Sequence, residues 1–126
     1  MARSRVENSS RPLVVVVDDD PAVRGSLAFS LEIEGFAVCV YADAADLLTD
    51  VPPAACFIID QKLPGMSGLD LLAELRRRHI GSPAILITTH PSAAVRERAA
   101  VSGTVLIEKP LLGDALFQEV RAALGR

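Results

Sequence analysis

The sequence contains few aromatic residues and no excess of basic residues. Trp is absent, Tyr41 is the single tyrosine, and aromatic residues make up 4% of the 126 residues. The hydrophobic core is therefore expected to consist of Val, Leu, Ile and Ala. The formal net charge of -3 argues against a general nucleic-acid binder or a binder of anionic membranes, because both usually carry a basic excess.

Long apolar segments and cysteine motifs are also missing. The longest apolar run near the N-terminus, Leu13–Val17, has five residues, too few for a membrane span or a signal-peptide core. Cys39 and Cys56 show neither CxxC nor Cys/His ligand spacing. These absences favour a reduced, cytoplasmic protein.

The length of the chain indicates one domain, large enough to bury a core without disulfides or structural metals. Residues 1–11 are polar and aperiodic, and we expect a flexible N-terminal segment there. The folded domain is expected to cover residues 12–126.

From Pro12 onward, short apolar runs rich in β-branched residues alternate with segments of helical periodicity. Asp20-Pro21 is typical of a helix start and Gly35 of a helix end. Ser67 to Asp70 resembles a capping box. The expected strands are Leu13–Val17, Phe36–Tyr41, Cys56–Ile59, Ala84–Ile87 and Thr104–Ile107. The expected helices begin near Pro21, Asp43, Ser67, Ser92 and Leu112, the last with an apolar stripe of Leu112, Leu116, Val120 and Leu124.

Strands and helices that alternate five times predict an α/β fold, a parallel sheet covered by helices on both faces. The second and fifth strands are the weakest runs, as edge positions allow. The run Arg76-Arg77-Arg78-His79 closes a predicted helix, where cations interact favourably with the helix dipole. We prefer that interpretation to a nucleic-acid patch.

Polar residues follow the strands at their carboxyl ends, the edge where open parallel sheets bind ligands. Gathered carboxylates repel one another unless a cation neutralises them, and Mg²⁺ accepts a few protein oxygens plus water. A metal beside an Asp also creates a place for a phosphoryl group. These residues are Asp18-Asp19-Asp20, Asp60, Thr88-Thr89-His90 and Glu108-Lys109-Pro110.

This constellation resembles the receiver domain of two-component response regulators. The resemblance covers roughly Leu13 to Leu124 and rests jointly on VVVVDDDPAVR, FIIDQKLPGMSGLDLL, ILITTH, IEKP and the five-fold strand-helix order. It implies a three-layer, doubly wound, flavodoxin-like receiver fold with strand order 2-1-3-4-5, an order that general rules also associate with the chemotaxis member of this family.

The resemblance also implies the site residues. Asp60 would be the phosphoacceptor, Asp19 a direct ligand of Mg²⁺ (or Mn²⁺), and Asp18 a ligand acting partly through water. Asp60 and the main-chain carbonyl of Lys62 would complete the protein ligands.

Thr88 would hydrogen-bond the phosphoryl group, and Lys109, expected before a cis proline, would pair with it. Lys62, Thr89 and His90 would border the phosphoryl group, and Lys62 and His90 would influence how fast water hydrolyses it.

Two positions depart from the family pattern. Leu106 stands where receivers usually carry Tyr or Phe, and Thr89 stands where Ala or Gly is usual. The stretch Val101–Leu106 is also one residue short of the usual turn. These departures concern the output signal rather than the phosphorylation chemistry.

The function that follows is that of a phosphoacceptor domain serving a histidine kinase or phosphotransfer protein, not an enzyme beyond its own phosphorylation and dephosphorylation. A receiver-like interaction module with phosphate-independent output is the alternative, and a metal-dependent phosphohydrolase ranks last. Neither nucleic acid nor membrane is an expected partner of this domain. The chain is either a stand-alone receiver or part of a longer regulator with an output domain, and dimers through residues 92–124 are a further option.

Overall fold

The computed structural model describes residues 11–111 and 113–125, in which five strands alternate with five helices. The strands pair in parallel in the order β2-β1-β3-β4-β5, which confirms the predicted receiver topology. Of the expected flexible segment 1–11, all but Arg11 lies outside the described residues, as does Leu112. The strands are β1 (Leu13–Val17), β2 (Ala37–Tyr41), β3 (Cys56–Asp60), β4 (Ala84–Thr88) and β5 (Val105–Glu108).

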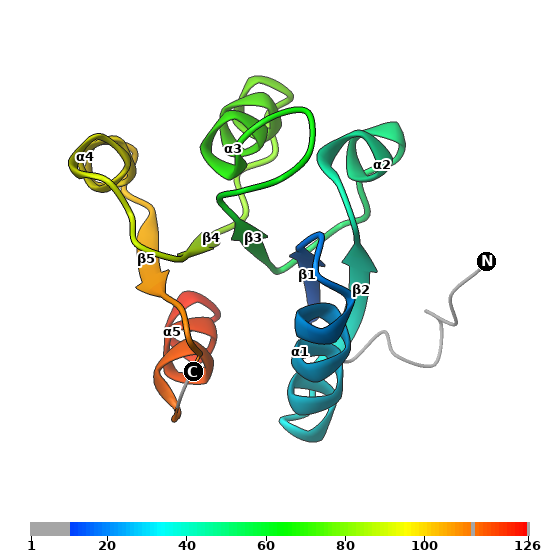
Figure 1. Ribbon diagram of the computed structural model, residues 1–126. Helices are drawn as coiled ribbons and strands as arrows, with labels where there is room; N and C mark the ends of the chain where they lie inside the picture. Colours follow the sequence, from blue (N-terminus) through cyan, green and yellow to red (C-terminus); the bar gives the residue numbers. More distant parts are fainter. Residues whose placement is uncertain (1–10, 112, 126) are drawn as a thin grey trace.

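The helices form two layers, one on each face of the sheet (Figure 1). Helices α2, α3 and α4 pack on one face, and α1 and α5 pack on the other. Because side chains alternate along a strand, Val15 and Val17 face the first layer while Val14 and Val16 face the second. The helices are α1 (Pro21–Ile33), α2 (Ala44–Thr49), α3 (Gly68–Arg77), α4 (Ala93–Val101) and α5 (Ala115–Ala123).

The core contains more aromatic side chains than the composition suggested. Phe36 and Phe57 are among the largest fully buried side chains, so the expectation of a core built from Val, Leu, Ile and Ala alone is wrong. Phe57 lies on central strand β3 and Phe36 directly precedes β2. Two aromatic rings therefore fill part of the core, together with the aliphatic side chains.

Local signals set the two ends of α1 and the start of α3 as predicted, whereas α5 begins at Ala115 rather than near Leu112. The Asp20 carboxylate accepts a hydrogen bond from the Ala22 amide at the start of α1. The Ser67 hydroxyl accepts one from the Asp70 amide at the start of α3. Gly35, just beyond α1, has φ +100°, the left-handed conformation that favours glycine at this position.

Three strands extend one residue beyond their predicted ends, β3 to Asp60, β4 to Thr88 and β5 to Glu108. Asp60 and Thr88 are the last residues of β3 and β4 rather than the first residues of loops, because Asp60 still pairs with Ile87 across the two strands. Both side chains are thereby attached to rigid, buried strands.

The remaining motifs have structural roles. Cys39 and Cys56 pack on opposite faces of the sheet, and burial raises the pKa of the Cys56 thiol to about 11. Arg76 donates to the Ile80 carbonyl and Arg78 to the Leu48 carbonyl on α2. These arginines therefore join the C-terminal end of α3 to the loop that follows it and to α2. Within the described residues, every helix is too short or too polar to cross a membrane.

Candidate functional site

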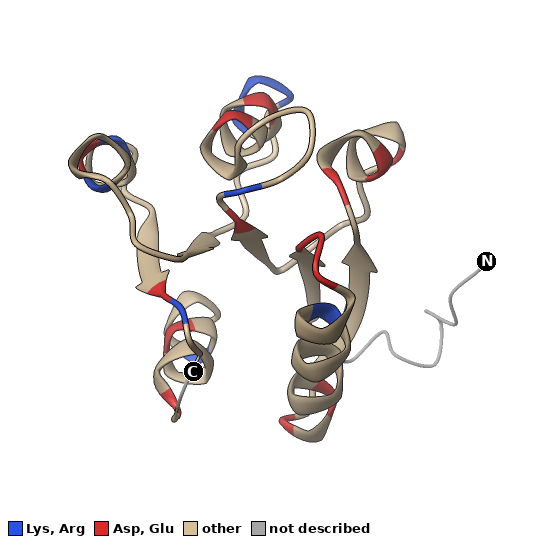
Figure 2. Cartoon of the chain, viewed as in Figure 1, with Lys and Arg blue, Asp and Glu red and all other residues tan. Residues whose placement is uncertain are grey.

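Three carboxylates meet at the carboxyl end of the sheet. Asp18 and Asp19 follow β1, Asp60 ends β3, and one oxygen of each lies within 4.8 Å of the others. Asp18 is 0% exposed and Asp60 is 5% exposed, whereas Asp19 is open to solvent. In Figure 2 the acidic segments that end β3 and follow β1 face the same edge as the basic segment after β5.

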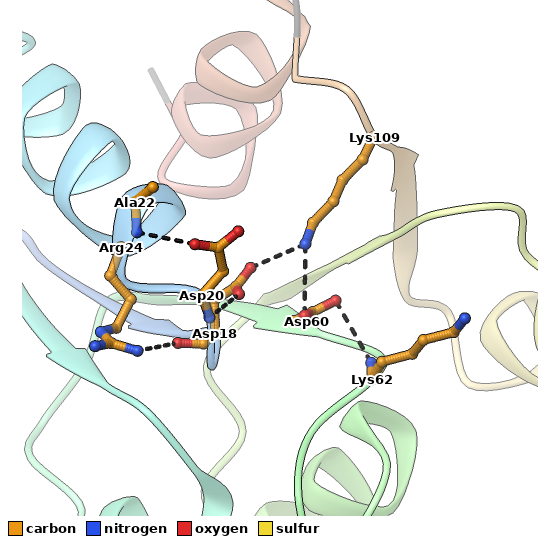
Figure 3. A network of polar contacts seen from close by, with 7 residues as sticks. All are labelled: Asp18, Asp20, Ala22, Arg24, Asp60, Lys62 and Lys109. Atoms are coloured by element: carbon orange, nitrogen blue, oxygen red, sulfur yellow. Dashed lines mark hydrogen bonds and ion pairs between the residues drawn. The ribbon is translucent and has the colours of Figure 1, made fainter.

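Lys109 is the cation of this cluster (Figure 3). Its Nζ lies 3.1 Å from Asp18 Oδ2 and 3.4 Å from Asp60 Oδ2. Its backbone amide donates to the Thr88 carbonyl at 2.7 Å, which ties the residue to the end of β4. The Lys109-Pro110 peptide is cis, as predicted.

The environment moves the pKa values of Asp60 and Lys109. Burial and the neighbouring charge of Asp18 raise the pKa of Asp60, although Lys109 and the Lys62 amide act in the opposite direction. Burial alone would lower the pKa of Lys109, but the hydrogen bond to Asp18 and the charges of Asp60 and Asp18 raise it overall. The cluster therefore holds more negative charge than one ammonium compensates.

This donor set fits a divalent cation. Carboxylate oxygens are the hard ligands that Mg²⁺ and Mn²⁺ accept, and their mutual repulsion in a buried site is relieved by a cation. The backbone of Lys62 also lies against the site, since its amide donates to Asp60 Oδ1 at 3.4 Å. Asp18, Asp19 and Asp60 would hold the ion.

Four of the predicted site residues line a cleft that begins directly after Asp60. The cleft has a volume of about 690 Å³ and lies between the loop after β3 and the loop after β4. Thr88, at 2% exposure, is buried at its floor, while Thr89 and His90 are exposed. The cleft-lining candidates are Lys62, Thr88, Thr89 and His90.

Leu106 occupies the position of the usual aromatic residue. It lies on β5 beside Leu86 of β4 and is half-buried against the core layer that contains α4. An aliphatic side chain there has neither a hydroxyl group nor an aromatic ring.

Arg24 was missed by the sequence reasoning. Its Nη1 donates to the Asp18 carbonyl at 2.8 Å, although it lies one turn into α1, where the helix dipole disfavours a cation. That conflict is the signal that could have revealed it, because an arginine placed against the dipole needs a local acceptor.

Gln61 and Gly68 also escaped notice. The Gln61 side chain accepts from the Leu69 amide at 3.0 Å and so caps α3; a polar residue directly after a buried strand was the available signal. A Cβ on Gly68 would lie 2.4 Å from the Asp60 carbonyl oxygen. Only glycine therefore lets α3 begin so close to Asp60.

Comparison with known proteins agrees with this geometry. The family model of the response regulator receiver domain matches residues 14–121. The chain is 41% identical over 116 residues to the transcriptional regulatory protein FixJ of Azorhizobium caulinodans, covering 90% of this chain and 55% of that protein. It is 36% identical over 123 residues to nodulation protein W of Bradyrhizobium diazoefficiens, covering 95% and 54%.

Solved structures show the same fold. A CheY-like receiver domain protein from Methanospirillum hungatei superposes with a TM-score of 0.85 at 27% identity, over 91% of this chain and 94% of that one. The receiver domain of Francisella response regulator 1452 gives 0.82 at 27% identity, over 92% and 98%. With the five-stranded order and the family match over residues 14–121, this chain belongs to the response regulator receiver domain family.

Proposed function

We propose that this receiver accepts a phosphoryl group on Asp60, in a Mg²⁺-dependent reaction, from a phosphohistidine of a histidine kinase or phosphotransfer protein. One observation carries the proposal: the Lys109 ammonium lies between the Asp18 and Asp60 carboxylates at 3.1 and 3.4 Å. A nucleophilic carboxylate, a metal-holding carboxylate and a cation thus converge at one sheet edge.

In the transfer step, an Asp60 carboxylate oxygen forms a bond to phosphorus while the phosphorus–nitrogen bond of the phosphohistidine breaks. The product is an acyl phosphate on Asp60 and a free imidazole on the donor. Lys109 offers its ammonium, and Thr88 its hydroxyl, to the phosphoryl oxygens. Mg²⁺, bound by Asp18, Asp19, Asp60 and the Lys62 carbonyl, would offset their charge.

The same residues would catalyse only reactions of the chain's own Asp60, its phosphorylation and its dephosphorylation. Water must approach the acyl phosphate to hydrolyse it, and Lys62, Thr89 and His90 line the cleft beside Asp60. We assign to Lys62 and His90 control over the lifetime of the phosphorylated state.

The wider role follows from the relatives. The chain spans about half the length of the curated relatives it matches, 55% of FixJ and 54% of nodulation protein W. We therefore propose that this domain works in the cytoplasm with an output domain and changes that domain's interactions on phosphorylation. Pairing of two copies through the α4-β5-α5 face would be one such change.

A phosphate-independent interaction module is the second candidate, and Leu106 favours it. The half-buried leucine on β5 replaces the residue type that normally couples Thr88 to the surface. An intact set of Asp18, Asp60 and Lys109 in contact favours the phosphoacceptor function over this alternative.

The deciding experiment is incubation of the chain with acetyl phosphate or phosphoramidate and Mg²⁺, followed by intact mass measurement. A mass increase that hydroxylamine removes, that requires Mg²⁺ and that Asp60→Asn abolishes is expected. Modification of Asp60→Asn to the level of the parent would show that another residue is the acceptor.

A further inference from the structure

The guanidinium of Arg24 holds the peptide that joins the two metal-site aspartates. Its Nη1 donates to the Asp18 carbonyl at 2.8 Å, and Figure 3 shows the side chain reaching from α1 to that oxygen. We propose that Arg24 is a positioning residue for the divalent cation, because it fixes the Asp18–Asp19 peptide and thereby directs the Asp19 carboxylate toward Asp60. This inference rests on the proposed Mg²⁺ site.

The other polar groups of Asp18 are held by different parts of the fold. Its amide donates to the Tyr41 carbonyl of β2 at 3.1 Å. One carboxylate oxygen accepts from the Asp20 amide at 2.9 Å and the other from Lys109. The hydrogen bond from Arg24 to the Asp18 carbonyl completes this set and comes from α1. Asp18 is therefore oriented by contacts with β2, the β1–α1 loop, Lys109 and α1.

Asp19 depends on this arrangement more than its neighbour does. It is exposed, and its carboxylate nevertheless lies within 4.8 Å of those of Asp18 and Asp60. The peptide before Asp19 is the one that Arg24 holds, and Asp20 after it begins α1 as the N-cap. The backbone is thus fixed on both sides of Asp19, which restricts the directions in which its side chain can point.

Charge and geometry make opposite predictions for this arginine. A cation near a metal site opposes binding of a second cation, so charge alone would make Arg24 weaken Mg²⁺ binding. Positioning of a ligand strengthens binding, and loss of residues that orient metal ligands typically costs 10–100-fold in affinity. Whether the Kd for Mg²⁺ rises or falls when Arg24 is replaced therefore distinguishes ligand positioning from charge repulsion.

The experiment compares Mg²⁺ binding by the parent, Arg24→Met, Arg24→Lys and the control Arg121→Met. Because the chain has no Trp, calorimetry or amide resonances would follow the titration, with thermal unfolding measured in parallel. Arg121 is a matched control, since it joins α5 to Glu34 beyond the end of α1 at 2.8 Å, at the opposite end of α1 from the N-cap Asp20. Its substitution removes the same charge and a hydrogen bond of the same length, together with an ion pair to Asp114 at 3.6 Å.

Arg24→Met is expected to raise the Kd for Mg²⁺ at least tenfold, Arg24→Lys to raise it less, and Arg121→Met to leave it unchanged. An unchanged or lower Kd in Arg24→Met would overturn the proposal, as would equal effects of Arg24→Met and Arg121→Met. If Arg24→Met does not fold, an unchanged Kd in Arg24→Lys would overturn it. Absence of Mg²⁺ binding by the parent would instead refute the proposed function.

Discussion

The carboxyl edge of the central strands and the α4–β5 face are built in different ways. Every residue of β3 and β4 is buried, whereas the ends of β5, Val105 and Glu108, are exposed. On α4 the structure buries Ala99, while Val101 is 82% exposed. One region is fixed by close packing, and the other lies against the core through few apolar contacts.

Two exposed ion pairs join α4 to its neighbouring elements. Arg96 contacts Glu108 of β5 at 3.1 Å, and Arg98 contacts Asp70 of α3 at 2.9 Å. Exposed pairs of this kind contribute little to stability and weaken with salt. The comparison indicates that close packing holds the candidate site rigidly, whereas the α4–β5 face is easier to displace.

The largest effect should come from crowding the rigid region. In Gly68→Ala the new Cβ would lie 2.4 Å from the Asp60 carbonyl oxygen and 2.9 Å from Leu86 Cδ1. Overpacking of this kind costs about 3 kcal/mol, measurable by urea unfolding.

Gly25→Ala in α1 is the matched control, because nothing lies within 4 Å of its Cβ position. Relief of the helix penalty of glycine should stabilise this variant by about 0.5–1 kcal/mol. If both alanine substitutions stabilised the protein, the close approach of α3 to Asp60 would have to be relaxed in solution.

The second effect concerns charge in the rigid region. Burial and Asp18 raise the pKa of Asp60, so the folded metal-free protein binds a proton that the unfolded chain has released. Stability then falls as pH rises from the ordinary Asp range through the folded pKa. Asp60→Asn, which lacks this charge, should be more stable than the parent at neutral pH, with the difference disappearing at low pH.

Asp70 on α3, which contacts Arg98 of α4, should show the opposite dependence of stability on pH. Its hydrogen bond with Arg98 lowers its pKa, so its stabilising effect is present above the ordinary Asp pKa and is lost as pH falls through the lowered value. Asp70→Asn should therefore lower the free energy of unfolding at neutral pH. Parallel pH profiles for the two asparagine variants would contradict the assigned shifts.

The third prediction addresses the coupling between the two regions. Beryllofluoride, which stands in for the phosphoryl group, is expected to bind with Mg²⁺ but to perturb residues 92–111 less than in a receiver with an aromatic residue at the position of Leu106. A ligand shifts a conformational equilibrium only through its differential contacts. Leu106→Tyr should enlarge the amide chemical-shift changes, and large changes in the parent that Leu106→Tyr leaves unaltered would show coupling without an aromatic residue.

The smallest effect should be loss of a surface ion pair on α4. A double-mutant cycle with Arg96→Gln and Glu108→Gln should give a coupling energy of about 0.5 kcal/mol. In 1 M NaCl this energy should vanish, because the charges are exposed and screened. A coupling that persists in salt would indicate that α4 is held more firmly than its burial suggests.

Features that depend on near neighbours could be predicted from the amino-acid sequence. Asp20, Gly35 and Ser67 act at helix ends through backbone groups a few residues away, and the β-branched run Leu13–Val17 is buried on both faces. The collection of Asp18, Asp60 and Lys109 at one edge also followed, because parallel strands present their carboxyl ends on the same side.

Contacts between side chains of distant elements could not be predicted, because they depend on how the helices pack on the sheet. Arg78 reaches a carbonyl thirty positions away on α2, and Phe36 and Phe57 fill the core because of where the helices pack. The position of Arg24 near the start of α1 indicates that it needs an acceptor, but nothing in the sequence shows that this acceptor is the Asp18 carbonyl. The angle at which α1 leaves β1 settles that choice, and this angle results from packing over the whole sheet face rather than from any local pattern.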